Sequence, residues 1–283
     1  IHCYSVYEGY FWEAVVARIR ECFEESIEGC LPEWGQGQFE INLYRSDALS
    51  MADTAVIFKT AVKQIAAEAG LSATFMAKWH ENYTGSSGHI HQSLADAASK
   101  ASLFHDAARP HAMSELFEHY TAGQFEVFRP AALFFAPFVN SYKRFLPDSF
   151  AGSMQTWGVD NRTVTYRVIN SSASKCRLEN RLGGSDLNPY VSFAACIGSG
   201  LRGIERRLKL PEAGTGNCYY TPGAATAPRS LEEAAHEAAA SPVAKEILSP
   251  AMVDNLVRIA LFEADVFKGR VTDLERRRYF EMA

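Results

Sequence analysis

The chain has 283 residues, of which 22% are charged and 47% hydrophobic, values that exclude a mainly disordered, collagen-like or coiled-coil protein. The longest apolar run, residues 131–139, is interrupted by Pro137 and is far shorter than the roughly 20 residues that span a bilayer. We therefore expect no transmembrane helix and no membrane partner. A net charge of -5 argues against a broad nucleic-acid surface and leaves room for a local basic pocket that binds a small phosphorylated ligand.

The six cysteines contain no CxxC pair, and a chain of this length needs no crosslinks to stabilise its core. They predict reduced thiols and a cytoplasmic location. The chain begins at Ile1, and no signal-peptide pattern follows it. This start suggests a fragment or a processed form of a longer protein.

The N-terminal part predicts helices and strands in alternation. Apolar residues at three-and-four spacing predict a helix over residues 10–28, which Gly29 and Pro32 end. Strict alternation over 38–44 predicts a half-buried strand with an acidic face. A second helix is expected over 48–69 and a short strand over 73–77.

The rest of the chain carries further strands and then becomes helical. His89-Ile90-His91 alternates, so that on a strand both imidazoles point to one face. Strands are also expected over 161–169 and 176–181. Helices are predicted over residues 113–124, 130–142, 189–206, 230–240, 249–266 and 272–282. This distribution predicts an α+β fold with one catalytic domain over residues 1–283.

Charged side chains gather on the predicted strands, which is costly unless those faces meet solvent or a ligand. Glutamates supply hard oxygen ligands suited to Mg²⁺ or Mn²⁺, histidine adds a nitrogen ligand, and arginine pairs with phosphate and carboxylate. The residues are Glu40, His89, His91, Arg162, Arg167, Arg177, Glu179 and Arg181, with Glu33 just before the first strand. Together they predict a site for an anionic substrate and a divalent metal.

Each pattern taken alone also fits an ordinary structural role. The HxH pair could be two solvent-facing histidines, and Arg177, Glu179 and Arg181 could form an exposed strand face of alternating charge. Glu33 and Glu40 could be surface carboxylates, and the loop over 85–88 could be a plain flexible turn.

The order and the residues of seven stretches distinguish these possibilities. Over nearly the whole chain, these stretches resemble the catalytic domain of the glutamine synthetase family. The stretches are EWGQGQFEIN (33–42), ATFMAK (73–78), GSSGHIHQSL (85–94), NSYKR (140–144), WGVDNR (157–162), RLENR (177–181) and NPY (188–190). The resemblance implies an α+β catalytic domain with an antiparallel curved sheet, flanking helices and a helical C-terminal part.

The resemblance also implies roles for individual residues. The implied metal ligands are Glu33 and Glu40 for one ion and His89 and Glu179 for another. The implied glutamate-binding residues are Gly85, Arg144 and Arg181, and the implied ATP-binding residues are His91, Ser93 and Arg177. Arg162 and Arg167 match the arginines that face the transferred phosphoryl group.

The implied reaction is an ATP-dependent ligation in which glutamate is phosphorylated on its γ-carboxylate and an amine displaces the phosphate. In glutamine synthetases a glutamate closes over the ammonium site, and in this chain Phe150, within LPDSFAG (146–152), stands in its place. The sequence of this loop and of the neighbouring matched stretches resembles the γ-glutamylpolyamine or γ-glutamylputrescine synthetase branch. A polyamine or other organic amine is therefore the expected acceptor. The alternatives are ammonia as the acceptor, with Phe150 a neutral loop change, and a catalytically inert structural member of the family.

Family members carry an N-terminal β-grasp domain and a strand with two further metal-binding glutamates, and neither precedes Ile1. The resemblance therefore leads us to expect an incomplete catalytic domain. It also implies a homo-oligomeric, dodecamer-like ring, because family active sites form between neighbouring subunits.

Overall fold

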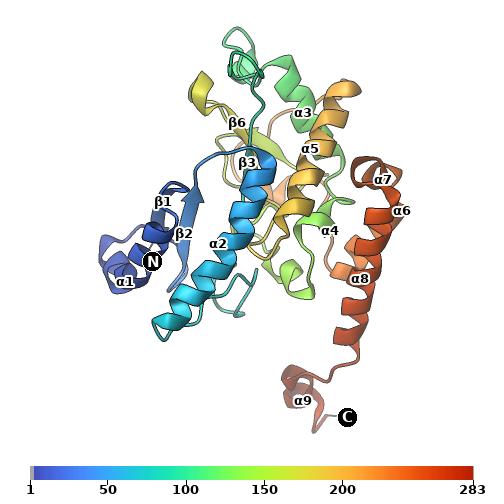
Figure 1. Ribbon diagram of the computed structural model, residues 1–283. Coiled ribbons are helices and arrows are strands. Elements are labelled where there is room, and N and C mark those ends of the chain that lie inside the picture. The colour runs from blue at the N-terminus through green and yellow to red at the C-terminus, as the bar shows by residue number, and fades with distance from the viewer. Residues whose placement is uncertain (1–2, 283) are drawn as a thin grey trace.

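The computed structural model describes residues 3–282 and shows an α+β fold, as expected. A small N-terminal unit packs beside a larger one (Figure 1). The small unit contains α1 (Val6–Cys22), β1 (Ile27–Pro32), β2 (Phe39–Leu43) and α2 (Ala48–Glu68). The strands of the larger unit are β3 (Ile90–Gln92), β4 (Trp157–Val159), β5 (Tyr166–Ile169) and β6 (Arg177–Asn180). Its helices are α3 (Glu115–Glu126), α4 (Ala132–Phe135), α5 (Pro189–Glu205), α6 (Leu231–Ala240), α7 (Pro242–Leu248), α8 (Pro250–Lys268) and α9 (Asp273–Tyr279).

The small unit has its own hydrophobic core. Strands β1 and β2 pair antiparallel, with Cys30 opposite Ile41. Ile19 of α1, Ile27 of β1 and both Phe58 and Ile65 of α2 form the buried cluster between these elements. The turn between β1 and β2 points out of this core towards the larger unit, where Gln38 contacts the loop at Gly85.

The larger unit is built on a four-stranded sheet with the strand order β3-β6-β5-β4. Neighbours β3–β6 and β6–β5 are antiparallel, as predicted for the sheet, and β4 joins β5 in parallel. The register places His91, Glu179 and Arg167 opposite one another, so these three side chains form a row across three strands. The other face carries Ile90 and Leu178 into the main core.

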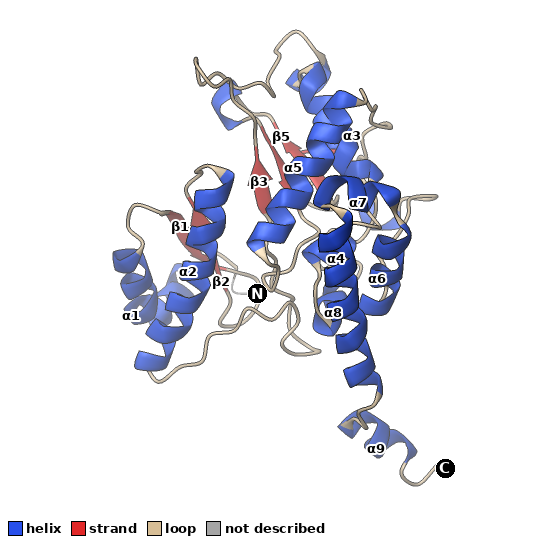
Figure 2. Ribbon diagram, turned by 45° about the vertical axis from the view of Figure 1, so that its right-hand side comes forward, coloured by secondary structure: helices blue, strands red, loops and turns tan. Residues whose placement is uncertain are grey.

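Helices cover the core face of this sheet. Helix α3 crosses α5 closely because glycines stand at the contact, and a Cβ on Gly123 would lie 1.9 Å from the carbonyl oxygen of Ser199. Helices α6, α7 and α8 pack together next to this pair. Both views show α9 extending away from the rest of the molecule (Figures 1 and 2). Within residues 3–282, no helix is both long and apolar enough to cross a membrane.

Most of the predicted helices are present, and the differences have local causes. The first helix ends at Cys22 rather than at residue 28, because residues 27–32 pair with β2. The predicted helix over 130–142 divides into α4 and a 3-10 turn (Val139–Arg144), because Pro137 cannot continue a helix. Helix α7 was not predicted; Ser241 caps its start.

Two strand predictions differ from the structure, and strands β1 and β4 were not predicted. The stretch 73–77 is not a strand; it is a connection whose Ala77 carbonyl accepts a hydrogen bond from the Ser86 amide. Strand β5 starts only at Tyr166, because the Asn161 side chain accepts bonds from Thr163 and holds the preceding residues in a turn. Strand β4 was not predicted, since three residues carry too little alternation to be recognised.

Candidate functional site

Glu179 lies at the centre of the polar face of the main sheet. Its side chain is only 3% exposed and is surrounded by donors from three strands. One oxygen lies 3.1 Å from Nδ1 of His89 and also accepts from Arg181, while the other accepts from Arg167 at 3.1 Å. Burial alone would raise the pKa of Glu179, but the hydrogen bond and charge of His89 and the charge of Arg181 outweigh it, so the pKa is lowered. Glu179 is therefore a carboxylate at neutral pH.

The two histidines lie on the same side of the sheet, as the HxH alternation predicts. His91 Nε2 is 3.8 Å from Glu179, and its Nδ1 accepts from Arg177 Nε at 3.0 Å. Burial lowers the pKa of both His89 and His91 to about 4, so both rings are neutral at pH 7. His89 Nε2 is buried without a hydrogen-bond partner among residues 3–282. This nitrogen is thus a free electron-pair donor inside the site.

A buried polar layer supports this face of the sheet from behind. Asn180, next to Glu179, donates to Gln124 of α3 at 3.1 Å, and Gln124 donates to Gln92 of β3 at 2.7 Å. Gln92 also accepts from the Tyr120 hydroxyl at 2.7 Å. Because these bonds join β3, β6 and α3, they fix the spacing between the strands that carry His91 and Glu179.

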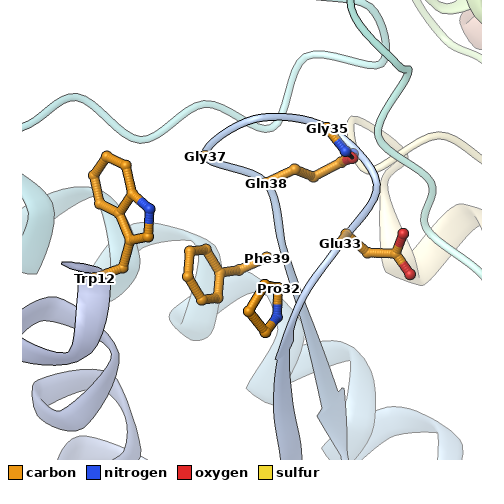
Figure 3. Close-up of a pocket in the computed structure, with 7 residues that line it drawn as sticks. All are labelled: Trp12, Pro32, Glu33, Gly35, Gly37, Gln38 and Phe39. Atoms are coloured by element: carbon orange, nitrogen blue, oxygen red, sulfur yellow. Dashed lines mark hydrogen bonds between the residues drawn. The ribbon is translucent and has the colours of Figure 1, made fainter. Parts of the chain in front are cut away.

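Glu33 and Glu40 lie at the turn between β1 and β2. Burial, together with a hydrogen bond and the like charge of Glu33, raises the pKa of Glu40. Figure 3 shows the Glu33 carboxylate pointing away from Trp12 and Phe39, which line a shallow pocket on the other side of the turn. Two facing carboxylates form a pair that a bound cation would stabilise.

Gln38 joins this turn to the loop before β3. Its Nε2 donates to the Gly85 carbonyl at 3.0 Å and to Ser86 Oγ at 3.1 Å, and its Oε1 accepts from Thr84 at 3.0 Å. A Cβ on Gly85 would lie 2.6 Å from Cγ of Arg144, so the loop approaches that side chain too closely for any other residue.

Arg144 is fully buried beneath this loop, with 2% of its surface exposed. It donates to Ser87 Oγ at 3.1 Å and to the Leu182 carbonyl, and burial lowers its pKa to about 10. Its Nε has no partner among the described residues. In this structure Arg144 therefore holds together two segments that surround the site.

Arg162 and Arg167 have different contacts. It is exposed and lines a hollow of about 550 Å³, together with Asp160, Asn161 and the chain segment 213–216. Its charge also partly offsets the raised pKa of Glu40. Arg167 instead bridges Asp160 and Glu179. Ser93 follows β3 and is exposed.

Phe150 lies in the loop that follows Arg144. Its carbonyl accepts from Arg181 Nη2 at 3.1 Å, and its ring lies 6.3 Å from the ring of Trp34. The loop thereby connects the Glu179 cluster with the turn that bears Glu33.

The structure brings the predicted residues together as two groups rather than one. His89, His91, Arg167, Arg177, Glu179 and Arg181 form the first group, and Glu33 and Glu40 form the second. Within residues 3–282, no three His, Cys, Asp or Glu side chains are close enough to hold one ion. Sequence reasoning gave no role to Gln38, Trp34 or Asp160, although all three lie in the stretches 33–42 and 157–162 that match the family. The contacts of Gln38 and Trp34 join segments distant in sequence, so the sequence alone does not reveal them.

Comparison with known proteins matches residues 11–279 to the glutamine synthetase catalytic domain. The chain is similar to γ-glutamylethanolamide synthetase GlnA4 of Streptomyces coelicolor, with 43% identity over 90% of this chain and 54% of that protein. It is also similar to a glutamate–isopropylamine ligase of a Pseudomonas species, with 37% identity over 99% of this chain and 62% of that protein. A solved structure described as "Apo GmaS without ligand" superposes with a TM-score of 0.89 at 29% identity, over 99% of this chain and 65% of that one. The chain thus spans between half and two thirds of the relatives it matches.

Proposed function

The chain belongs to the glutamine synthetase catalytic-domain family, and from this we propose that it forms the catalytic part of an ATP-dependent ligase that joins glutamate to an organic amine. The observation that carries this proposal is the row His91, Glu179 and Arg167, with Arg181 beside it, on the open face of the main sheet. The names of similar proteins support it, since they describe ligation of glutamate to ethanolamine and to isopropylamine.

The proposed reaction has two balanced steps. A γ-carboxylate oxygen of glutamate attacks the terminal phosphorus of ATP, the bond to ADP breaks, and γ-glutamyl phosphate forms. The neutral amine nitrogen then attacks the acyl carbon, the carbon–oxygen bond to phosphate breaks, and the proton that the nitrogen loses passes to the departing phosphate. Phosphoryl transfer depends mainly on positioning and charge neutralisation, so no protein nucleophile is needed.

The arginines supply this charge. We assign Arg162 and Arg167 to the transferred phosphoryl group, because both carry guanidinium groups at the rim of the site and Asp160 contacts one and lines a hollow with the other. Glutamate is assigned to Arg181, Arg144 and Gly85. ATP is assigned to His91, Ser93 and Arg177, along the outer end of β3 and β6.

The donor groups fit divalent metal ions. We assign one Mg²⁺ or Mn²⁺ ion to Glu33 and Glu40, where burial and the neighbouring Glu33 carboxylate raise the pKa of Glu40. We assign a second to His89 and Glu179, where a buried imidazole nitrogen has no partner among the described residues. Such ions would neutralise the charge of the phosphates. Each pair supplies only two ligands, and substrate or further protein groups would complete each shell.

The acceptor is proposed to be an organic amine, polyamines included, rather than ammonia, because an apolar ring at Phe150 gives carbon chains a surface to contact. Ammonia is the second candidate. Proteins named glutamine synthetase are also similar to this chain, among them one from Dictyostelium discoideum at 39% identity over 92% of the chain.

Assembly and location belong to the same proposal. Large apolar side chains stay exposed, among them Val6 of α1, Phe262 of α8 and Phe280 just after α9, and contact between copies in a dodecamer-like ring would cover them. All six cysteines are free thiols, which suits the reducing cytoplasm.

The test is an assay of phosphate release by the full natural protein that contains this chain. Release should require glutamate, ATP and an amine together, with a higher kcat/KM for ethanolamine or putrescine than for ammonia. Arg167→Ala should abolish release, and Arg258→Ala, at an exposed position of α8, should leave it unchanged. No release with any amine contradicts the proposal, and preference for ammonia selects the second candidate.

A further inference from the structure

Two aromatic side chains from distant parts of the chain meet beside Glu33. Trp34 stands in the β1–β2 turn and Phe150 in the loop after Arg144, and their ring centroids are 6.3 Å apart with an interplanar angle of 55°. Trp34 is 45% exposed and Phe150 46% exposed, so each keeps nearly half of its surface open despite the contact. Such open, tilted rings leave apolar surface for a small ligand.

The backbone at both rings is held in place. The turn is closed by bonds from Glu33 N to the Gln38 carbonyl at 2.8 Å and from Gln38 N to the Gly35 carbonyl at 2.9 Å. On the other side, Arg181 donates to the Phe150 carbonyl at 3.1 Å. Hydrogen bonds therefore hold the backbone that carries each ring, as a preformed binding surface requires.

Phe150 also has an unfavourable backbone conformation. Its φ is 55°, in the left-handed region that bulky residues rarely adopt. The bond to Arg181 and the burial of the next residue, Ala151, maintain this conformation. Strain of this kind concentrates at ligand sites, and here it turns the ring towards Trp34.

The charges next to the rings suit a cation. The Trp34 amide donates to the Glu33 carboxylate at 2.8 Å, and Glu40 lies beside Glu33. In Figure 3 this carboxylate points away from the rings of Trp12 and Phe39. An alkylamine reaches the site as an ammonium ion, which aromatic faces and carboxylates both attract, while its carbon chain gains from apolar contact.

We propose that Trp34, with Phe150, forms an aromatic slot that selects the carbon chain of a short primary alkylamine, and that Trp34 is a specificity-determining residue of the site. This inference rests on the ligase activity proposed above. Trp34 is expected to act mainly on the amine, because its contacts are with Phe150 and the Glu33 carboxylate.

The test measures kcat/KM for ammonia, methylamine, ethylamine and n-propylamine, with the full natural protein, saturating ATP and glutamate. In the wild type, kcat/KM should increase up to about fourfold for each methylene group that leaves water on binding. Trp34→Ala should remove most of this increase, change kcat/KM for ammonia less than about threefold, and leave the KM for glutamate unchanged. Trp34→Tyr should restore part of the increase, because it keeps an aromatic face.

Trp79→Ala is the matched control. Trp79 is 48% exposed, close to the value for Trp34, but its ring stacks on Tyr83 at 4.9 Å and 11° instead of facing Phe150. This variant should keep the wild-type increase along the amine series. Thermal unfolding of each variant checks folding, and Trp34→Leu replaces Trp34→Ala if the latter does not fold.

The outcomes separate the two proposals. If the wild type turns over no amine, both the ligase activity and the slot are wrong. If amines are ligated and Trp34→Ala keeps the wild-type increase with chain length, the slot is wrong and the ligase activity stands. If Trp79→Ala reduces the increase of kcat/KM with amine chain length as strongly as Trp34→Ala does, Trp34 has no specific role and the inference is overturned.

Discussion

Arg181 connects two parts of the candidate site, because one arm of its guanidinium contacts Glu179 and the other donates to the Phe150 carbonyl. A lysine keeps the charge, but its single ammonium cannot make both contacts from the same position. The planar fork is therefore the feature that matters at this position.

We expect Arg181→Lys to raise the KM for glutamate at least about tenfold, because both the carboxylate-binding charge and the loop at Phe150 lose their fixed position. Arg206→Lys is the control, since Arg206 is an exposed residue that pairs with Glu246 at 2.9 Å. The KM for glutamate is measured from initial rates over a range of glutamate concentrations. The same glutamate dependence in Arg181→Lys and wild type would remove Arg181 from the site.

Asp186 gives a prediction about pH. Burial raises the pKa of this carboxyl, whose Oδ2 accepts from Ser141 at 2.6 Å. A group whose folded pKa lies above its unfolded value stabilises the fold fully below the unfolded pKa, and this stability is lost as the pH rises through the folded pKa. Wild type should therefore lose this contribution between about pH 4 and neutral pH.

Asp186→Asn keeps an acceptor for Ser141 and removes the titration. The free energy of unfolding of this variant, measured in urea, should increase relative to that of wild type as the pH rises from about 4 to 7, because only wild type loses the contribution of Asp186. A constant difference between the two proteins over this range would contradict a raised pKa for Asp186.

At the scale of elements, the crossing of α3 and α5 depends on glycine. A Cβ on Gly123 would lie 1.9 Å from the Ser199 carbonyl, and one on Gly203 would lie 2.1 Å from the His119 carbonyl. Both contacts are with backbone, so the helices would have to move apart. Helix α3 carries Gln124, whose bonds to β3 and β6 support the site from behind.

Gly123→Ala should lower the free energy of unfolding by roughly 3 kcal/mol, because the methyl group overpacks the helix crossing. Gly269→Ala is the matched control at the end of α8, where φ is -78° and the nearest atom to a new Cβ is 3.8 Å away. Its effect should stay within about 0.5 kcal/mol. Urea unfolding measures the free energy of unfolding of both variants. Equal values would show that α3 and α5 can move apart without loss of stability.

Local signals explain which elements could be predicted from the sequence. Helices α5, α6, α8 and α9 begin within one residue of their predicted starts, because Asn188, Ser230, Ser249 and Thr272 cap them through bonds to nearby amides. Strands depend on distant partners, so the stretch 73–77 looked like a strand and is not one, while three-residue β4 gave no signal.

The same distinction holds for the candidate site. The family resemblance selected His89, Glu179, Arg167 and Arg181, which the fold gathers around one carboxylate. Trp34 could not be selected, because its significance arises only when Phe150, far along the chain, lies next to it. Their roles in binding and catalysis stay predictions.

At the scale of the whole molecule, the candidate residues come from two units, each with its own hydrophobic core. The small unit carries Glu33 and Glu40, the large unit carries Glu179 and its donors, and Gln38 joins them through the loop at Gly85. Two carboxylates thus lie on the small unit, while Glu179 lies with Arg167 and Arg181 on the large one. This arrangement suits the proposed reaction between an anion and an amine.

The central claim is that an amide forms through γ-glutamyl phosphate, and an isotope-transfer measurement tests it most directly. Glutamate labelled with oxygen-18 in its γ-carboxylate is incubated with ATP, ethylamine and the full natural protein, and the released phosphate is analysed by mass spectrometry. We predict one labelled oxygen in each phosphate for every γ-glutamylethylamide formed, since the carboxylate oxygen that attacks ATP leaves with the phosphate. Amide formation with unlabelled phosphate, or no amide at all, would contradict the claim.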